Sequence, residues 1–99
     1  MKEDVIKIAA HYGIEAQARQ TMEECAELIV ALNKYLRKTT NGQGVNDEYL
    51  AVRKNVAEEI ADVKIMLEQI ECLLECEKLV EIIKESKILR TLQRMDKEE

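Results

Sequence analysis

The feature that most restricts the fold of this chain is its lack of helix-breaking residues. Among 99 residues there is no proline, and the three glycines occupy only two places, Gly13 and the pair Gly42 and Gly44. Residues of high helix propensity fill most of the remainder, and the few β-branched residues never alternate as they would in a strand. The sequence therefore predicts an all-α fold, with helix ends at the two places where glycine occurs.

The spacing of apolar residues predicts where the first three helices lie. The first ends near His11, before Gly13, and the second spans about residues 14–37. A loop over residues 39–47 follows, read as an insertion, and Asn46 or Asp47 caps the third helix. Apolar stripes at helical spacing are the predicted core faces. They are Met22, Cys25, Ile29, Leu32 and Leu36 on the second helix, and Val52, Val56, Ile60, Val63, Leu67, Ile70 and Leu74 on the third.

A fourth helix is expected because the third cannot continue to the end of the chain. A single helix from Glu48 to Met95 would be about 70 Å long, too long for a compact domain. The apolar phase also shifts after Leu74, since the next apolar residues fall roughly on the opposite side. We expect a turn at residues 75–78 and a frayed, charged tail at 96–99. The whole chain, residues 1–99, is expected to form a single four-helix, bundle-like domain.

Composition argues against several classes of protein. The three cysteines are an odd number with no Cys-x-x-Cys pair, which favours a reduced, cytoplasmic protein. The charged N-terminus lacks a secretory signal, and no apolar run is long enough to cross a membrane. The net charge of −5 disfavours a nucleic acid polymer as partner. An acidic protein can still bind a nucleotide when a divalent cation lies between them.

Two acidic pairs carry the main chemical prediction. Glu24 and Glu27 are three residues apart on the second helix, and Glu59 and Asp62 are three apart on the third. Residues at this spacing project from the same side of a helix, so antiparallel packing would bring four carboxylates together. Glu59 lies close to the middle of the apolar stripe, where a charge is costly unless it is paired.

Such a cluster must take up protons or a cation. Two carboxylates about 5 Å apart repel by roughly 3 kcal/mol at an effective dielectric near 20. Hard oxygen ligands suit magnesium, with manganese as an alternative. A di-iron site would need Glu-x-x-His pairs, and the only histidine, His11, lies on another helix. The competing interpretation is that these are ordinary solvated glutamates in a chain with 20 acidic residues.

The motifs resemble a known family. Glu23-Glu24-Cys25-Ala26-Glu27-Leu28, followed by Glu58-Glu59-Ile60-Ala61-Asp62-Val63, is similar to the EExxE and ExxD signature of the MazG-like nucleoside triphosphate pyrophosphohydrolases. Lys87-Ile88-Leu89-Arg90 is similar to the basic K-x-x-R stretch of that family. The resemblance implies an all-α, magnesium-dependent enzyme, assembled as a homodimer or dimer of dimers, that cleaves nucleoside triphosphates to monophosphates and pyrophosphate.

The resemblance also implies roles for single residues. Glu24, Glu27, Glu59 and Asp62 would bind magnesium, and Lys87 and Arg90 would contact phosphate. Glu24 is the predicted general base for the attacking water. Three polar residues that share the acidic stripes are further candidates for substrate contacts: Gln20, Lys34 and Asn55. The expected role is nucleotide-pool housekeeping. The alternatives are a non-catalytic nucleotide sensor and an acidic adaptor.

Overall fold

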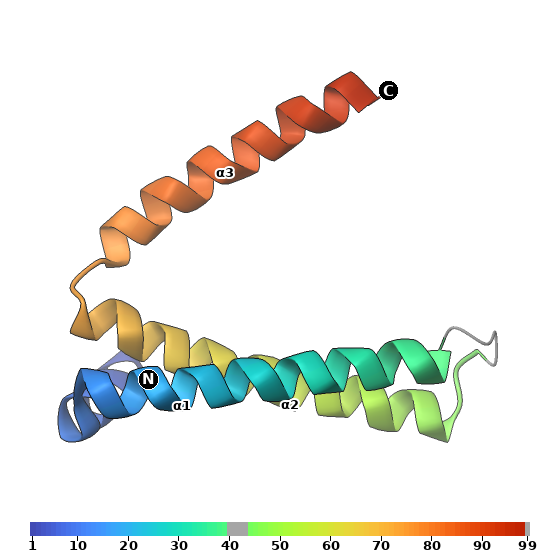
Figure 1. Ribbon diagram of the computed structural model, residues 1–99, viewed down its shortest axis with the longest axis horizontal. Coiled ribbons are helices and arrows are strands. Elements are labelled where there is room, and N and C mark those ends of the chain that lie inside the picture. The colour runs from blue at the N-terminus through green and yellow to red at the C-terminus, as the bar shows by residue number, and fades with distance from the viewer. Residues whose placement is uncertain (40–43, 99) are drawn as a thin grey trace.

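The computed structural model describes residues 1–39 and 44–98, which form three helices. They are α1 (Lys2–Thr39), α2 (Asp47–Leu73) and α3 (Glu77–Glu98). Helices α1 and α2 lie side by side as an antiparallel pair, and α3 extends away from the end of α2 to form an open V with the pair (Figure 1). The all-α prediction is confirmed. Residues 40–43 of the expected loop and residue 99 of the tail lie outside the described residues.

Gly13 divides α1 into the two segments that the sequence predicts as separate helices. Its φ of 85° and ψ of 171° are not helical, and a positive φ of this size favours glycine because it has no Cβ. The residues before Gly13 consequently fold back at one end of the pair (Figure 1). Within residues 1–39 and 44–98 there are thus three helices by continuous count but four helical segments.

The ends of α2 follow from local capping. Asn46 is the N-cap, and its side chain accepts a hydrogen bond of 2.8 Å from the backbone N–H of Tyr49, as predicted. The other end closes with a Schellman motif, in which the N–H of Cys76 donates to the carbonyl of Glu71 over 3.1 Å. Glu75 takes the left-handed position of this motif with a φ of 50°. The expected turn at 75–78 is present, and α3 begins within it at Glu77.

The contact between α1 and α2 is a seam of residues spaced alternately four and three apart, the pattern of an antiparallel coiled coil. Every member is buried or half-buried. The seam consists of Gln17, Thr21, Glu24, Leu28, Ala31 and Tyr35 on α1, and of Val52, Val56, Glu59, Val63, Met66 and Ile70 on α2. Two of the candidate ligands, Glu24 and Glu59, are therefore seam residues.

The seam divides the pair into two sides. On each helix, the residue that precedes a seam residue in the sequence lies on one side of the seam, and the residue that follows it lies on the other. Because the two right-handed helices are antiparallel, the preceding residues of both helices lie on the same side of the pair. The first set gives the acidic side, with Gln20, Glu27, Lys34, Asn55 and Asp62. The second set gives the apolar side, with Met22, Ile29, Leu32, Leu36, Ile60 and Leu67.

This division corrects the predicted core faces. The stripe predicted for residues 14–37 is not the face that packs on α2, because Met22 is 68% exposed and Ile29 is 61% exposed. On α2, Val52 and Val63 are buried as expected, but Ile60 and Leu67 are exposed, as is Leu74, the C-cap residue that follows the helix. The true seam contains polar residues that hydrophobic periodicity does not detect. None of the helices in the described residues has an apolar stretch sufficient to cross a membrane.

Candidate metal centre

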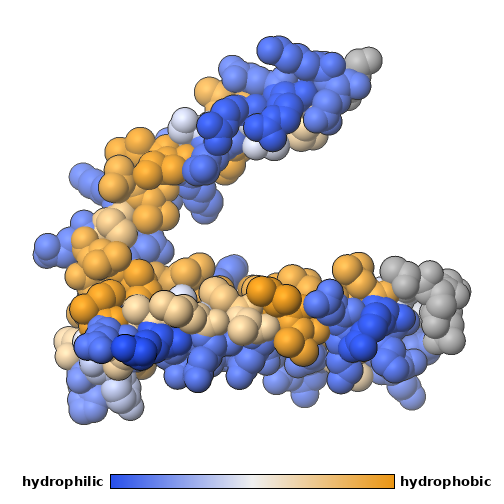
Figure 2. All heavy atoms as spheres, viewed as in Figure 1, coloured by the Kyte–Doolittle hydropathy of each residue, from blue (hydrophilic) through white to orange (hydrophobic). Residues whose placement is uncertain are grey.

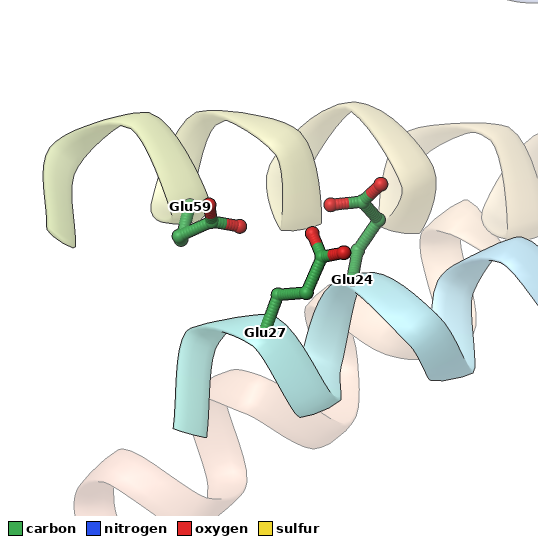
Figure 3. Close-up of side chains that lie close together, drawn as sticks. All are labelled: Glu24, Glu27 and Glu59. Atoms are coloured by element: carbon green, nitrogen blue, oxygen red, sulfur yellow. The ribbon is translucent and has the colours of Figure 1, made fainter. Parts of the chain in front are cut away.

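Three of the four predicted ligands converge between α1 and α2. Glu24 and Glu27 from α1 and Glu59 from α2 each offer a carboxylate oxygen, and the three oxygens lie within 4.8 Å of one another. Figure 3 shows the three side chains directed toward one another in the space between the helices. The cluster follows from the seam, since Glu24 and Glu59 occupy seam positions and Glu27 lies one turn along α1, on the acidic side.

Two oxygens of this cluster are buried without a hydrogen-bond donor. Glu24 Oε2 and Glu59 Oε2 are both shielded from solvent and have no partner among the described residues. The other oxygen of Glu24 accepts a hydrogen bond of 2.8 Å from Gln20 Nε2. A buried carboxylate oxygen without a partner carries a large desolvation cost, and few such atoms occur in folded proteins. Two of them within one cluster of three carboxylates are explained by a cation or by protons.

The electrostatics of the third carboxylate are consistent with crowding. The pKa of Glu27 is raised above its usual 4.5, first by the negative charge of Glu24 and then by a hydrogen bond between the two carboxyl groups. Desolvation and the charge of Glu59 raise it further. Since Glu27 is exposed, its carboxyl group is accessible from the acidic side. The cluster therefore takes up positive charge more readily than an isolated glutamate would.

The donor set fits a hard divalent cation. All three groups are carboxylates, with no sulfur or imidazole among them, which suits magnesium or manganese. Magnesium commonly binds one or two protein carboxylates and keeps several waters, so three converging carboxylates with one open, exposed edge are sufficient. Glu24, Glu27 and Glu59 are the residues that would hold the ion.

Asp62, the fourth predicted ligand, is not part of the converging group. It lies on α2 one turn after Glu59 and precedes the seam residue Val63, so it is on the acidic side. Its side chain is exposed, and its carboxylate is not among the oxygens that come together. Asp62 is placed beside the cluster, where it can act on a bound ion through water or on a ligand.

The predicted polar contacts divide into two groups. Gln20, Lys34 and Asn55 lie on the acidic side with the cluster. Asn55 and Glu59, together with Glu27, line a shallow pocket of about 300 Å³. Asn55 also lines an adjacent pocket of about 290 Å³ with Lys34. The two hollows share Asn55 as a lining residue.

Lys87 and Arg90 are not near the cluster within one chain. Both are exposed on α3, which contacts the pair only through its first turns, near the end of α2 and the start of α1, and then extends away from it (Figure 1). The structure therefore separates the predicted phosphate contacts from the predicted metal ligands. In a single chain, positive charge on the acidic side comes from Lys34 and from Lys38, which lines the same pocket.

Sequence reasoning missed two features of this region. Lys38 was not singled out, although it forms an ion pair of 2.7 Å with Glu48 at the mouth of the second pocket. The buried pair Gln17 and Gln69 was also missed as a structural element, with Gln17 Nε2 donating to Gln69 Oε1 over 2.7 Å. Reading the sequence for four-and-three spacing that includes polar residues would have placed Gln17, Glu24 and Glu59 in one seam.

No protein-family model, curated protein or solved structure matches this chain. The assignment of function therefore depends on the chemistry of the residues themselves.

Proposed function

We propose that this chain is a magnesium-dependent hydrolase of nucleoside triphosphates, which releases a nucleoside monophosphate and pyrophosphate. The observation that carries the proposal is the pair of buried oxygens without a hydrogen-bond partner, Glu24 Oε2 and Glu59 Oε2, on two of the three carboxylates that converge. The motif resemblance supplies the reaction, and the carboxylate cluster supplies a place for the ion that the reaction needs.

The proposed reaction is the attack of water on the α-phosphorus. A new phosphorus–oxygen bond forms, the bond to the β-phosphate oxygen breaks, and pyrophosphate leaves. A bound magnesium ion would neutralise phosphate charge and lower the pKa of a coordinated water. Glu24 is the proposed acceptor of the water's proton, because its carboxylate lies in the cluster and is oriented by the hydrogen bond from Gln20.

The pockets of the acidic side are the proposed place for the rest of the nucleotide. Lys34 and Lys38 would attract phosphate oxygens, and Asn55 can donate to or accept from a sugar or base. Asp62 is proposed to assist the ion from its exposed position beside Glu59. Lys87 and Arg90 are still proposed as phosphate contacts, and assembly of more than one chain would have to bring them to the acidic side.

The test is release of pyrophosphate from a panel of canonical and modified ribo- and deoxyribonucleoside triphosphates, with magnesium and with EDTA. The wild-type chain should release pyrophosphate only with magnesium. Glu59→Gln should lower kcat by 100-fold or more, on the order of the loss expected when a metal-binding group is removed. Glu58→Gln is the matched control, because this neighbouring residue makes the same change of charge at an exposed position and should leave activity within about twofold.

Two results would contradict the proposal. One is a folded wild-type chain that releases no pyrophosphate from any nucleotide of the panel. The other is magnesium-dependent release that Glu58→Gln and Glu59→Gln reduce equally. Tight nucleotide binding without product would instead identify a sensor built on the same site.

A further inference from the structure

The apolar side of the α1–α2 pair has no covering in the single chain. Met22, Ile29 and Leu36 on α1 are each more than half exposed, and Ile60 and Leu67 on α2 continue the same side. In Figure 2, hydrophobic residues gather on the side of the pair that faces α3, whereas charged residues dominate the opposite side. A contiguous apolar surface of this extent on a charged protein indicates an interaction site.

Helix α3 carries a second apolar surface. All of its residues, 77–98, are exposed, and none is buried. In its second half, Ile88, Leu92 and Met95 follow each other at spacings of four and three, which places them on one face. At roughly 100° per residue, Arg90 lies about half a turn from this face, and Lys87 and Arg94 lie about a third of a turn from it. The helix is therefore amphipathic without a partner in its own chain.

The solvent-accessible surface area of the chain is larger than that of a compact monomer of the same mass. The accessible surface is 8102 Å². A compact monomer of 11.4 kDa is expected to expose about 5,800 Å², so this chain exposes about 2,300 Å² more. Two chains that each buried this excess would share an interface of about 4,600 Å², within the range of obligate homodimers.

The turn before α3 holds the helix away from its own pair. The Schellman motif at Glu71–Cys76 satisfies the carbonyls at the end of α2, and the next bond, from Val80 N–H to the Cys76 carbonyl over 2.9 Å, starts α3 at once. An ion pair of 3.4 Å between Lys2 and Glu77 also ties the start of α3 to the beginning of α1. These contacts favour the open V over closure of α3 onto its own chain.

We propose that a second copy of this chain covers both surfaces, with α3 of each copy packed in the V of the other. Ile88, Leu92 and Met95 would lie against the apolar side, around Ile29 and Ile60 of the second copy. The acidic side points the other way, so both carboxylate clusters stay open in the dimer, and Lys87 and Arg90 would reach a cluster only through a further contact between dimers. The argument depends on exposed apolar area and holds whether or not the chain hydrolyses nucleotides.

The first test is the mass of the full chain in solution, by sedimentation equilibrium without nucleotide or metal. We expect twice the 11.4 kDa of one chain at micromolar concentration. Leu92→Glu and Ile29→Glu should each weaken the dimer at least 100-fold. Val30→Glu is the matched control, because Val30 is as exposed as its neighbour Ile29 (64% against 61%) but lies one position before a seam residue, on the acidic side. It should leave the dimer intact.

A second measurement keeps the inference testable if a separated chain does not stay folded. A photo-reactive amino acid at Leu92 is activated in a mixture of isotopically heavy and light chains. The proposal requires cross-linked peptides that join a heavy to a light chain, with the attachment on the apolar side. A monomeric wild type, a dimer that Ile29→Glu and Val30→Glu affect equally, or cross-links confined to single chains would overturn it.

Discussion

The α1–α2 pair and α3 resemble each other in the spacing of their apolar residues but differ in how far those residues are buried. Both carry apolar residues at helical spacing, yet the pair buries Ala31, Val52, Val63 and Met66 in its seam, whereas α3 buries nothing. Amphipathic spacing therefore predicts that one face of a helix will be buried, but it does not identify the element or chain that buries it. The seam of the pair is covered within the chain, whereas no part of the described chain covers α3.

The largest expected effect comes from making the same substitution in both regions. Met66 is 6% exposed in the seam, and Met95 is 52% exposed on α3. Met66→Ala should lower the free energy of unfolding by about 2–4 kcal/mol through lost burial and a residual cavity. Met95→Ala should change it by less than about 0.5 kcal/mol in a monomeric chain. Urea denaturation of both variants in the Ile29→Glu background would measure this, and equal losses would contradict the comparison.

The buried amide pair offers a second way to separate the two regions. Gln69 is 1% exposed and Gln17 is 7% exposed, and the two side chains satisfy each other across the seam. Gln69→Leu should cost about 1–3 kcal/mol, because it leaves the amide of Gln17 buried without its partner. The double variant Gln17→Leu/Gln69→Leu should recover most of the loss.

Exposed Gln93 on α3 provides the control for the amide pair. Gln93→Leu removes the same amide without leaving a buried partner, so it should be nearly neutral. Thermal unfolding, followed by circular dichroism at 222 nm, would compare the stability of the wild type with that of Gln69→Leu, the double variant and Gln93→Leu. If the double variant is no more stable than Gln69→Leu alone, the amide pair is not the cause of the loss.

Local signals were sufficient to predict the helices. Gly13, Asn46 and the shift of apolar phase after Leu74 each mark a helix end, because backbone conformation and capping depend on a few neighbouring residues. The packing face of α1 was not predictable in the same way. Its apolar stripe is stronger than its seam, which contains Gln17, Thr21 and Glu24, so hydrophobicity points to the face that the single chain leaves exposed.

The candidate site, like the fold, was predictable in part. Spacing alone places Glu24 with Glu27 and Glu59 with Asp62, but it cannot tell a seam position from its neighbour on the acidic side. That distinction depends on how the two helices meet, and it explains why Asp62 stays outside the converging oxygens. The separation of Lys87 and Arg90 from the cluster depends on the direction of α3, which the sequence does not reveal because Glu75, and not a glycine, takes the left-handed position of the turn.

A smaller effect concerns the pH dependence of the metal-free chain. Because the pKa of Glu27 is raised in the folded state, folding favours its protonated form. The stabilisation is fully present below the usual pKa of 4.5 and is lost as pH rises through the raised value. Stability measured in EDTA should therefore fall over this interval, and Glu27→Gln should flatten the fall.

Magnesium should reverse this pH effect. At neutral pH the ion is expected to stabilise the wild-type chain and to have little effect on Glu27→Gln, since binding to the folded state adds to stability only where the site is intact. Differential scanning fluorimetry across pH, with EDTA or magnesium, reads both outcomes. No residue of α3 contributes to the cluster, so Lys87→Gln should leave the pH profile unchanged. A flat profile in the wild type would show that the carboxylates do not crowd one another.

The smallest effect tests the turn that joins the two regions. Glu75 holds the left-handed position of the Schellman motif with a φ of 50°, which costs a residue with a Cβ about 1 kcal/mol. Glu75→Gly should therefore raise the free energy of unfolding by roughly 0.5–1 kcal/mol. Glu68→Gly, in the regular part of α2, should instead lower it by about 1 kcal/mol. A loss from Glu75→Gly would mean that the turn does not persist in solution. The turn would then not explain the direction of α3 or the open V.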